Sequence, residues 1–130
     1  MPTITIRDET LTGQSIAEYP LDLLTERVTV RELIRSRVYQ EVQDYNHRKP
    51  ETFHGLVQPT DAEETLNGFH LRNHREIDWK KQFDKACDAF ERNGFFVLVN
   101  DRQPDSLDEE LTIDSTDTVT FVKLVPLVGG

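Results

Sequence analysis

Several features that define protein classes are scarce in this chain or missing from it. Cys87 is the only cysteine among 130 residues, so no internal disulfide is possible, and we expect the protein to work in a reducing cytoplasm. No apolar run reaches the ~18 residues of a membrane-spanning helix. The opening stretch MPTITIRDET lacks the basic start and apolar centre of a secretory signal, so we expect none.

Basic residues are also in the minority. There are 15 lysines and arginines against 24 aspartates and glutamates, giving a formal net charge of −9. A surface of this sign repels nucleic-acid phosphates and anionic membranes, so we expect neither as a partner. It fits proteins that carry basic patches. The length of 130 residues predicts a single domain over 1–130, with a core that needs no disulfide or structural metal.

The N-terminal part predicts two strands joined by a turn. The stretch TITIRD alternates β-branched and polar residues, which places Ile4 and Ile6 on one face. ETLTGQS, which contains Gly13, reads as a turn, and SIAEYPLDLL reads as a second strand. We expect Pro20 near the end of that strand or at a bulge. The short link between the strands predicts a hairpin.

A helix is predicted over 29–46. Thr29 and Glu32 have the spacing of a capping box, in which each side chain satisfies a free backbone N–H. Apolar residues then recur at helical spacing: Val30, Leu33, Ile34, Val38, Val42 and Tyr45. Lys49-Pro50 is expected to end the helix.

Residues 47–77 show no convincing periodicity and are interrupted by prolines and glycines, which predicts a long loop or an insertion. A second helix is predicted over 78–93, with Asp78 as its N-cap and Asn93-Gly94 at its C-terminal end. One face of this helix is apolar: Trp79, Phe83, Ala86, Cys87 and Phe90.

The last third predicts three strands. FFVLVND reads as a buried central strand, LDEELTI as a short strand, and TVTFVKLV as the last strand. Two strands, a helix, an insertion with a helix and three more strands predict an α+β fold, in which a mixed sheet packs on a crossing helix. The first and last strands of such sheets often lie side by side and parallel.

Two stretches resemble known families. TLTGQSIAEYPLD followed by TVRELI resembles the opening of ubiquitin. The C-terminal third is similar to the sulfur carriers of thiamine and molybdopterin biosynthesis, which have a V-N turn, a D-x-V turn and a C-terminal Gly-Gly. The equivalents here are Val99-Asn100, Asp117-Thr118-Val119 and a tail over 126–130. The two matches cover about two-thirds of the chain and imply a β-grasp (ubiquitin-like) fold with a helical insertion at about 47–94.

The resemblance to bacterial ubiquitin-like modifiers implies a carrier and substrate, not an enzyme. Its expected partners are an adenylating (activating) enzyme, which uses ATP, a conjugating enzyme, a deconjugating protease and target proteins. The Gly130 carboxylate would be adenylated, and Gly129 would let the backbone enter a narrow channel because it has no Cβ. Pro126, Leu127 and Val128 would guide docking as an uncharged, extended leash. No bound cofactor is expected.

Three alternatives stay open at this point. The chain fits a sulfur carrier whose Gly130 becomes a thiocarboxylate. It also fits a β-grasp interaction module that is never conjugated, with the insertion as its binding part. The plainest alternative is that Gly129 and Gly130 are a frayed end with no function.

Three further features have a functional and a structural interpretation. Leu98, Val122 and Leu124 would form an apolar partner surface on the open face of the sheet, unless the helix of the insertion covers that face. His70 and His74 have the spacing of helical metal ligands, but the stretch is not clearly helical, so we expect surface histidines and no metal. Cys87 lies on an apolar helix face, which favours a buried small side chain over a nucleophile.

Overall fold

The computed structural model describes residues 2–48, 52–53, 55–59, 62–65, 68–71 and 76–123. In chain order the elements are β1 (Thr3–Thr10), β2 (Ser15–Asp22), β3 (Arg27–Thr29), α1 (Val30–Arg48), β4 (Thr52–Phe53), β5 (Ala62–Thr65), β6 (Gly68–Leu71), α2 (Trp79–Glu91), β7 (Phe95–Val99), β8 (Glu110–Thr112) and β9 (Thr118–Lys123). This is an α+β fold, as the sequence predicts.

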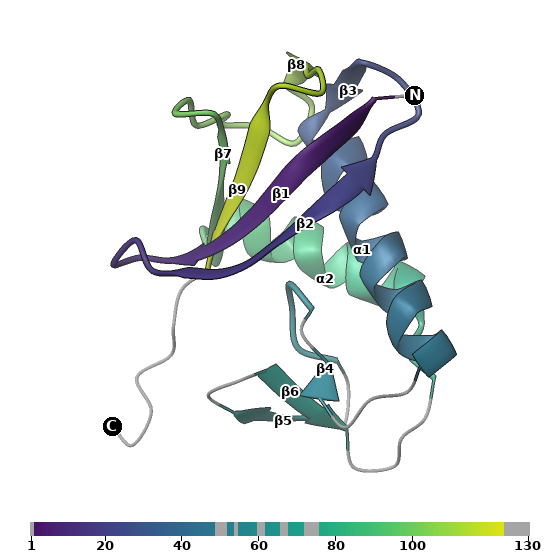
Figure 1. Cartoon of the computed structure of the whole chain (residues 1–130). Coiled ribbons are helices and arrows are strands. Elements are labelled where there is room, and N and C mark those ends of the chain that lie inside the picture. The colour runs from purple at the N-terminus through teal and green to yellow at the C-terminus, as the bar shows by residue number, and fades with distance from the viewer. Residues whose placement is uncertain are drawn as a thin grey trace.

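The centre of the fold is a four-stranded mixed sheet in the order β2-β1-β9-β7. β1 is antiparallel to β2 and parallel to β9, and β7 is antiparallel to β9. The predicted hairpin and the predicted parallel pairing of the first and last strands are therefore confirmed. Both helices lie on the same face of this sheet (Figure 1). The inner face buries Ile4, Ile6, Val97, Val119 and Phe121 against them.

Helix α1 begins where the capping residues predict. The Thr29 hydroxyl accepts the backbone N–H of Glu32 at 3.1 Å, which satisfies one of the free donors of the first turn. The loop before β8 satisfies two more, because the N–H groups of Val30 and Arg31 donate to the carbonyls of Glu109 and Leu107. Every apolar residue of the predicted helical stripe is buried, and Arg37 is buried with them.

Helix α2 is also confirmed, with ends one or two residues inside the prediction. Asp78 caps it by accepting the N–H groups of Lys80 at 3.0 Å and Lys81 at 3.4 Å. At the other end Asn93 has a φ of 61°, the left-handed conformation that commonly follows a helix. Trp79 packs edge-on against Tyr39 of α1, with ring centroids 5.3 Å apart. The helix of the insertion, α2, thus packs against the crossing helix, α1.

Two predictions about strands are wrong. β7 is an edge strand of the sheet and not a central one, because β9 takes the position between β7 and β1. Residues 47–77 are not a structureless loop, since β4, β6 and β5 form a small separate sheet. These strands have two to four residues each, too few to show a two-residue period. A further pair, β3 with β8, was not predicted.

The two turn motifs of the C-terminal third contact each other. Asn100 has a φ of 55°, and its side-chain oxygen accepts the N–H of Thr118 at 3.1 Å. The amide group of Asn100 donates to Asp117 at 2.9 Å, and the N–H of Asn100 donates to the Thr118 carbonyl at 2.8 Å. Residues 18 positions apart therefore join the end of β7 to the start of β9 and set their register.

Candidate functional site

The predicted site begins where β9 ends. Lys123, the last residue of β9, lies opposite Thr10 of β1 and Phe95 of β7. Six residues with predicted roles follow it and lie outside the described residues: Leu124 of the partner surface, Pro126, Leu127 and Val128 of the docking tail, and Gly129 and Gly130 of the conjugation site. What the structure gives is therefore the frame from which the tail starts.

The remaining two residues of the predicted partner surface lie on the face of the sheet that points away from the helices. We call this the outer face: Arg7, Glu9, Phe96, Leu98, Thr120 and Val122. Phe96, Val122 and Glu9 form one row across three strands, and Leu98, Thr120 and Arg7 form the next. Leu98 and Val122 are half-buried. Because α2 lies on the opposite face (Figure 1), it does not cover these residues, and their role with a partner stays a prediction.

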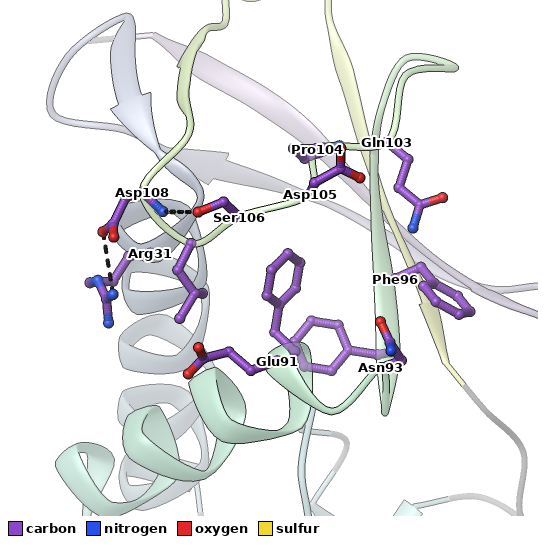
Figure 2. Close-up of a pocket in the computed structure, with 12 residues that line it drawn as sticks. Arg31, Glu91, Asn93, Phe96, Gln103, Pro104, Asp105, Ser106 and Asp108 are labelled. Carbon is purple, nitrogen blue, oxygen red and sulfur yellow. Dashed lines mark hydrogen bonds and ion pairs between the residues drawn. The ribbon is translucent and has the colours of Figure 1, made fainter.

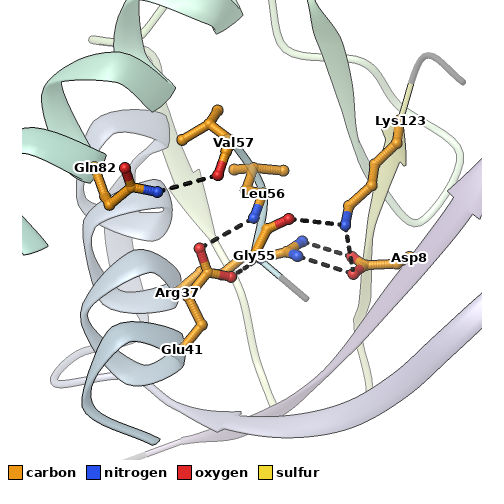
Figure 3. A network of polar contacts seen from close by, with 8 residues as sticks. All are labelled: Asp8, Arg37, Glu41, Gly55, Leu56, Val57, Gln82 and Lys123. Atoms are coloured by element: carbon orange, nitrogen blue, oxygen red, sulfur yellow. Dashed lines mark hydrogen bonds and ion pairs between the residues drawn. The ribbon is translucent and has the colours of Figure 1, made fainter. Parts of the chain in front are cut away.

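A buried network of charges lies on the inner face near the end of β9 (Figure 3). We use this term for Asp8, Arg37, Glu41 and Lys123. Arg37 of α1 is 1% exposed. Its guanidinium donates two hydrogen bonds to the Asp8 carboxylate of β1, at 2.5 and 2.8 Å. Its guanidinium also lies over the Phe121 ring, 4.4 Å from the centroid. This forked pairing is the geometry in which a buried arginine and carboxylate stabilise each other best.

The same network holds the insertion against the sheet. The Nε of Arg37 donates to Glu41 at 3.2 Å, and Glu41 accepts the N–H of Leu56 at 3.1 Å. Lys123 donates to the Gly55 carbonyl at 3.1 Å and lies 3.7 Å from Asp8. The residue that precedes the tail is thus bound to the start of the insertion.

Burial and neighbouring charges act on these groups in opposite directions. Burial by itself would lower the pKa of Arg37, but Glu41, Tyr19 and Asp8 raise it above its ordinary value, so Arg37 stays charged. Burial, followed by the charge of Arg37, lowers the pKa of Lys123. Burial raises the pKa of Glu41 although Arg37 opposes the shift. The two cations and two carboxylates cancel, so the network is a neutral structural joint.

Sequence reasoning missed this network, although its signals are in the sequence. Arg37 and Glu41 fall on the buried stripe of α1, beside Ile34, Val38 and Val42. Asp8 continues the inward alternation of Ile4 and Ile6. A charge of each sign at inward positions of a strand and its covering helix indicates a buried ion pair.

A cavity of about 270 Å³ lies between the end of α2, the edge of β7 and residues 103–108 (Figure 2). Arg31 pairs with Asp108 at its rim at 3.3 Å, and the Ser106 hydroxyl accepts the N–H of Asp108 at 3.2 Å. These contacts hold the loop that caps α1. The polar groups of Arg31 and Ser106 are therefore used in shaping that loop.

The insertion holds two kinds of side chain that can carry chemistry, the Cys87 thiol and the histidines His70 and His74. Cys87 is buried, as predicted, and burial raises the pKa of its thiol, which disfavours the reactive thiolate. His70 lies on strand β6 and not on a helix, and His74 lies outside the described residues. Within the described ranges, no group of His, Cys, Asp and Glu has the arrangement of a metal site. No helix among those residues is long and apolar enough to span a membrane.

Comparisons of this chain with protein-family models, with curated proteins and with solved structures find no match. The inferences about function therefore rest on the residues and on the geometry described above.

Proposed function

We propose that this chain is a ubiquitin-like protein modifier, whose Gly130 carboxylate is adenylated by an activating enzyme and then conjugated to target proteins. The observation that carries the proposal is the strand order β2-β1-β9-β7, with β1 parallel to β9 and α1 crossing the inner face. This is the arrangement expected of a β-grasp fold. It makes the strand before the Gly-Gly sequence a central strand of the sheet, which gives the tail a rigid base.

The turn motifs support the same assignment. In the sequence, Val99-Asn100 and Asp117-Thr118-Val119 resemble two separate turn motifs of the sulfur carriers, which share the expected β-grasp fold with the ubiquitin-like modifiers. In this fold Asn100 bonds both Asp117 and Thr118. Two motifs that fix one strand register carry more weight than two isolated matches, because the side chains of Asn100 and Asp117 bond each other across the turn.

The chemistry assigns the reaction to the partner enzyme. A carboxylate oxygen of Gly130 attacks the α-phosphate of ATP, and pyrophosphate leaves. A cysteine thiolate of the partner then attacks the acyl carbon, AMP leaves and a thioester forms. An amine of the target finally takes the acyl group and releases the thiol. The modifier supplies an accessible terminus, and the outer face, with Leu98 and Val122, supplies a surface for docking.

A second candidate is a sulfur carrier of the reducing cytoplasm. The Asn100–Asp117 contact favours it equally, because that turn pair comes from the sulfur-carrier resemblance. The first step is the same, but sulfide takes the acyl group from the adenylate and leaves a thiocarboxylate. The third candidate is a β-grasp module that is not conjugated, for which the extra sheet β4-β6-β5 is the supporting observation.

One experiment separates the candidates. The full chain is incubated with an adenylating enzyme from the same genome, with ATP and magnesium, and intact masses are measured. A thioester adduct or a ladder of conjugates is the result expected for a modifier, and exchange of one oxygen for sulfur is the result for a carrier. A matched control carries an amide in place of the Gly130 carboxylate, which keeps the fold and removes the group that would be adenylated. If the native and the amidated chains give the same products, both tail functions are excluded.

A further inference from the structure

A groove lies between the edge strand β2 and the C-terminal half of α1, and no residue of the outer face lines it. We call it the β2–α1 groove, and its volume is about 600 Å³. Residues from both elements, from β1 and from the insertion line it: Thr3, Tyr19, Pro20, Leu21, Asp22, Gln40, Glu41, Asp44, Tyr45, Arg48 and Phe53.

The floor of the groove is aromatic and apolar. Tyr45 of α1 is 3% exposed, and its ring packs edge-on against Phe53 with centroids 5.4 Å apart. The Tyr45 hydroxyl is buried and has no hydrogen-bond partner in the described part of the chain. A buried hydroxyl without a partner is destabilising by ~1–3 kcal/mol unless a further group satisfies it. A polar group of a ligand that bonds this hydroxyl would therefore contribute more binding free energy than the same bond at the surface.

The rim is acidic on balance, because three carboxylates and one cation line the groove: Asp22, Glu41, Asp44 and Arg48. Asp22 accepts a hydrogen bond from the Thr3 hydroxyl at 2.5 Å, and Asp44 accepts one from the Gln40 amide at 3.1 Å. Both donors are neutral, so neither hydrogen bond pairs the aspartate with a cation. Glu41 is different, because Arg37 pairs with it inside the core. A cationic ligand would therefore meet Asp22 and Asp44.

The edge of β2 is poorly suited to adding another strand. The N–H of Leu23 donates to the Pro2 carbonyl, and hydrogen-bonded and non-bonded pairs alternate along an antiparallel ladder. Pro20, which lies opposite Thr5, therefore occupies a position whose backbone N–H would point to the free edge. Proline has none, which protects an edge strand from pairing. An occupant of the groove is thus held through its side chains.

We propose that the β2–α1 groove docks a basic segment of a partner protein. The aliphatic stem of an arginine or lysine lies on Tyr45 and Leu21, and its charged head reaches Asp22 and Asp44. The chain's net charge of −9 attracts such a segment over a longer range. This inference does not depend on the proposed conjugation chemistry, because none of the residues that carry it, Asp22, Asp44 and Tyr45, has a role in that chemistry.

The test is an NMR titration of the isotope-labelled full chain with a capped peptide, Ala-Arg-Leu-Arg-Ala. The expected result is a set of saturable shifts confined to β2 and the second half of α1. The double variant Asp22→Asn with Asp44→Asn should bind about tenfold more weakly, since two exposed charge pairs are removed. A matched variant, Asp101→Asn with Asp105→Asn, removes the same charge from an exposed turn and should bind like the native chain.

Three results would overturn the proposal. Equal weakening in both double variants would mean that only overall charge attracts the peptide. A capped Ala-Val-Ile-Val-Asp peptide that binds the groove as tightly would mean that apolar or strand-adding ligands are the occupants. Shifts that grow with protein concentration without peptide would assign the groove to a second copy of the chain.

Tyr45→Phe, which keeps the ring, should fold normally and bind the arginine peptide more weakly.

Discussion

The two faces of the four-stranded sheet carry charges in opposite ways. On the inner face, Asp8 and Arg37 are almost fully buried and form a forked pair. On the outer face, Arg7 is 41% exposed and contacts Glu18 and Glu9 at 3.2 and 3.7 Å. Arg7 and Asp8 are neighbours in the chain, yet one contact belongs to the core and the other to the solvent.

This difference separates the residues that hold the fold together from those that are free to serve a partner. A buried charge cannot lose its counterion without a large penalty, so the inner pair fixes how β1, α1 and the insertion fit together. An exposed pair is screened by water and contributes little. The exposed outer-face residue Arg7 can therefore be replaced without loss of the fold, which makes it suitable for separating binding from stability.

The largest contrast is expected from replacing the two arginines. Arg37→Met leaves Asp8 and Glu41 buried beside a neutral side chain and should lower the free energy of unfolding by about 3–5 kcal/mol. Arg7→Met should lower it by about 0–1 kcal/mol. Urea unfolding of both variants, followed by circular dichroism, measures the difference.

A second variant keeps this test informative if Arg37→Met does not fold. Adding Asp8→Leu removes the carboxylate that the arginine neutralised and should recover part of the lost stability. If Arg37→Met and Arg7→Met unfold at the same urea concentration, the buried network does not join the elements as described.

The two valines of β9 provide the next contrast. Val119 is fully buried on the inner face, and Val122 is half-buried on the outer face. Val119→Ala should lower the free energy of unfolding by about 2–3 kcal/mol, from lost burial and the cavity that remains. Val122→Ala should lower it by less than about 1 kcal/mol, while weakening binding of the activating enzyme. Thermal unfolding and a pull-down measure the two effects. Equal destabilisation would mean that both faces of β9 are covered.

Both helices could be predicted from sequence because their signals are local. Thr29 and Asp78 mark their starts, and the apolar stripe that contains Leu33 and Val38 follows the helical period. Each of these signals is contained within a few turns of chain. The N-terminal hairpin was predictable for the same reason, since Gly13 with a φ of 86° lies in a short turn between two alternating stretches.

The order of strands and the buried network depend on contacts between distant residues, which local patterns do not specify. FFVLV is as apolar as a central strand, but Phe96 and Leu98 face outward from an edge position. Arg37 meets Asp8 from 29 positions away. The strands β4, β5 and β6 are held by pairing with one another, so no single one has a readable pattern.

Asn100, in the turn that follows β7, should have a smaller effect on the free energy of unfolding. Two substitutions there separate the backbone conformation from the side-chain hydrogen bonds. Asn100→Ala should lower the free energy of unfolding by about 2 kcal/mol, because it loses two side-chain hydrogen bonds and strains a left-handed residue. Asn100→Gly loses the bonds but accepts the φ of 55°, so it should lower the free energy less, by about 1 kcal/mol. Urea midpoints compare them. If Gly is the more damaging variant, the left-handed backbone is not what Asn100 supplies.

The smallest effect is expected at the exposed turn before β9, and it depends on pH. The hydroxyl of Thr116 donates to the Asp114 carboxylate at 2.5 Å and its N–H donates at 2.8 Å. These bonds favour the charged form and lower the pKa of Asp114. A lowered carboxyl pKa contributes stability above the ordinary pKa of aspartate, and that contribution disappears as the pH falls through the lowered value.

Thr116→Val removes the hydroxyl bond and keeps the backbone one. Its urea midpoint should lie slightly below that of the native chain at neutral pH, and the two midpoints should converge in acid, where Asp114 is protonated in both. Thr12→Val, in the exposed turn between β1 and β2, provides the control, since among the described residues its hydroxyl bonds Thr10 and no carboxylate. A Thr116→Val deficit that stays constant from neutral pH into acid would show that the hydroxyl acts by packing and not through the charge of Asp114.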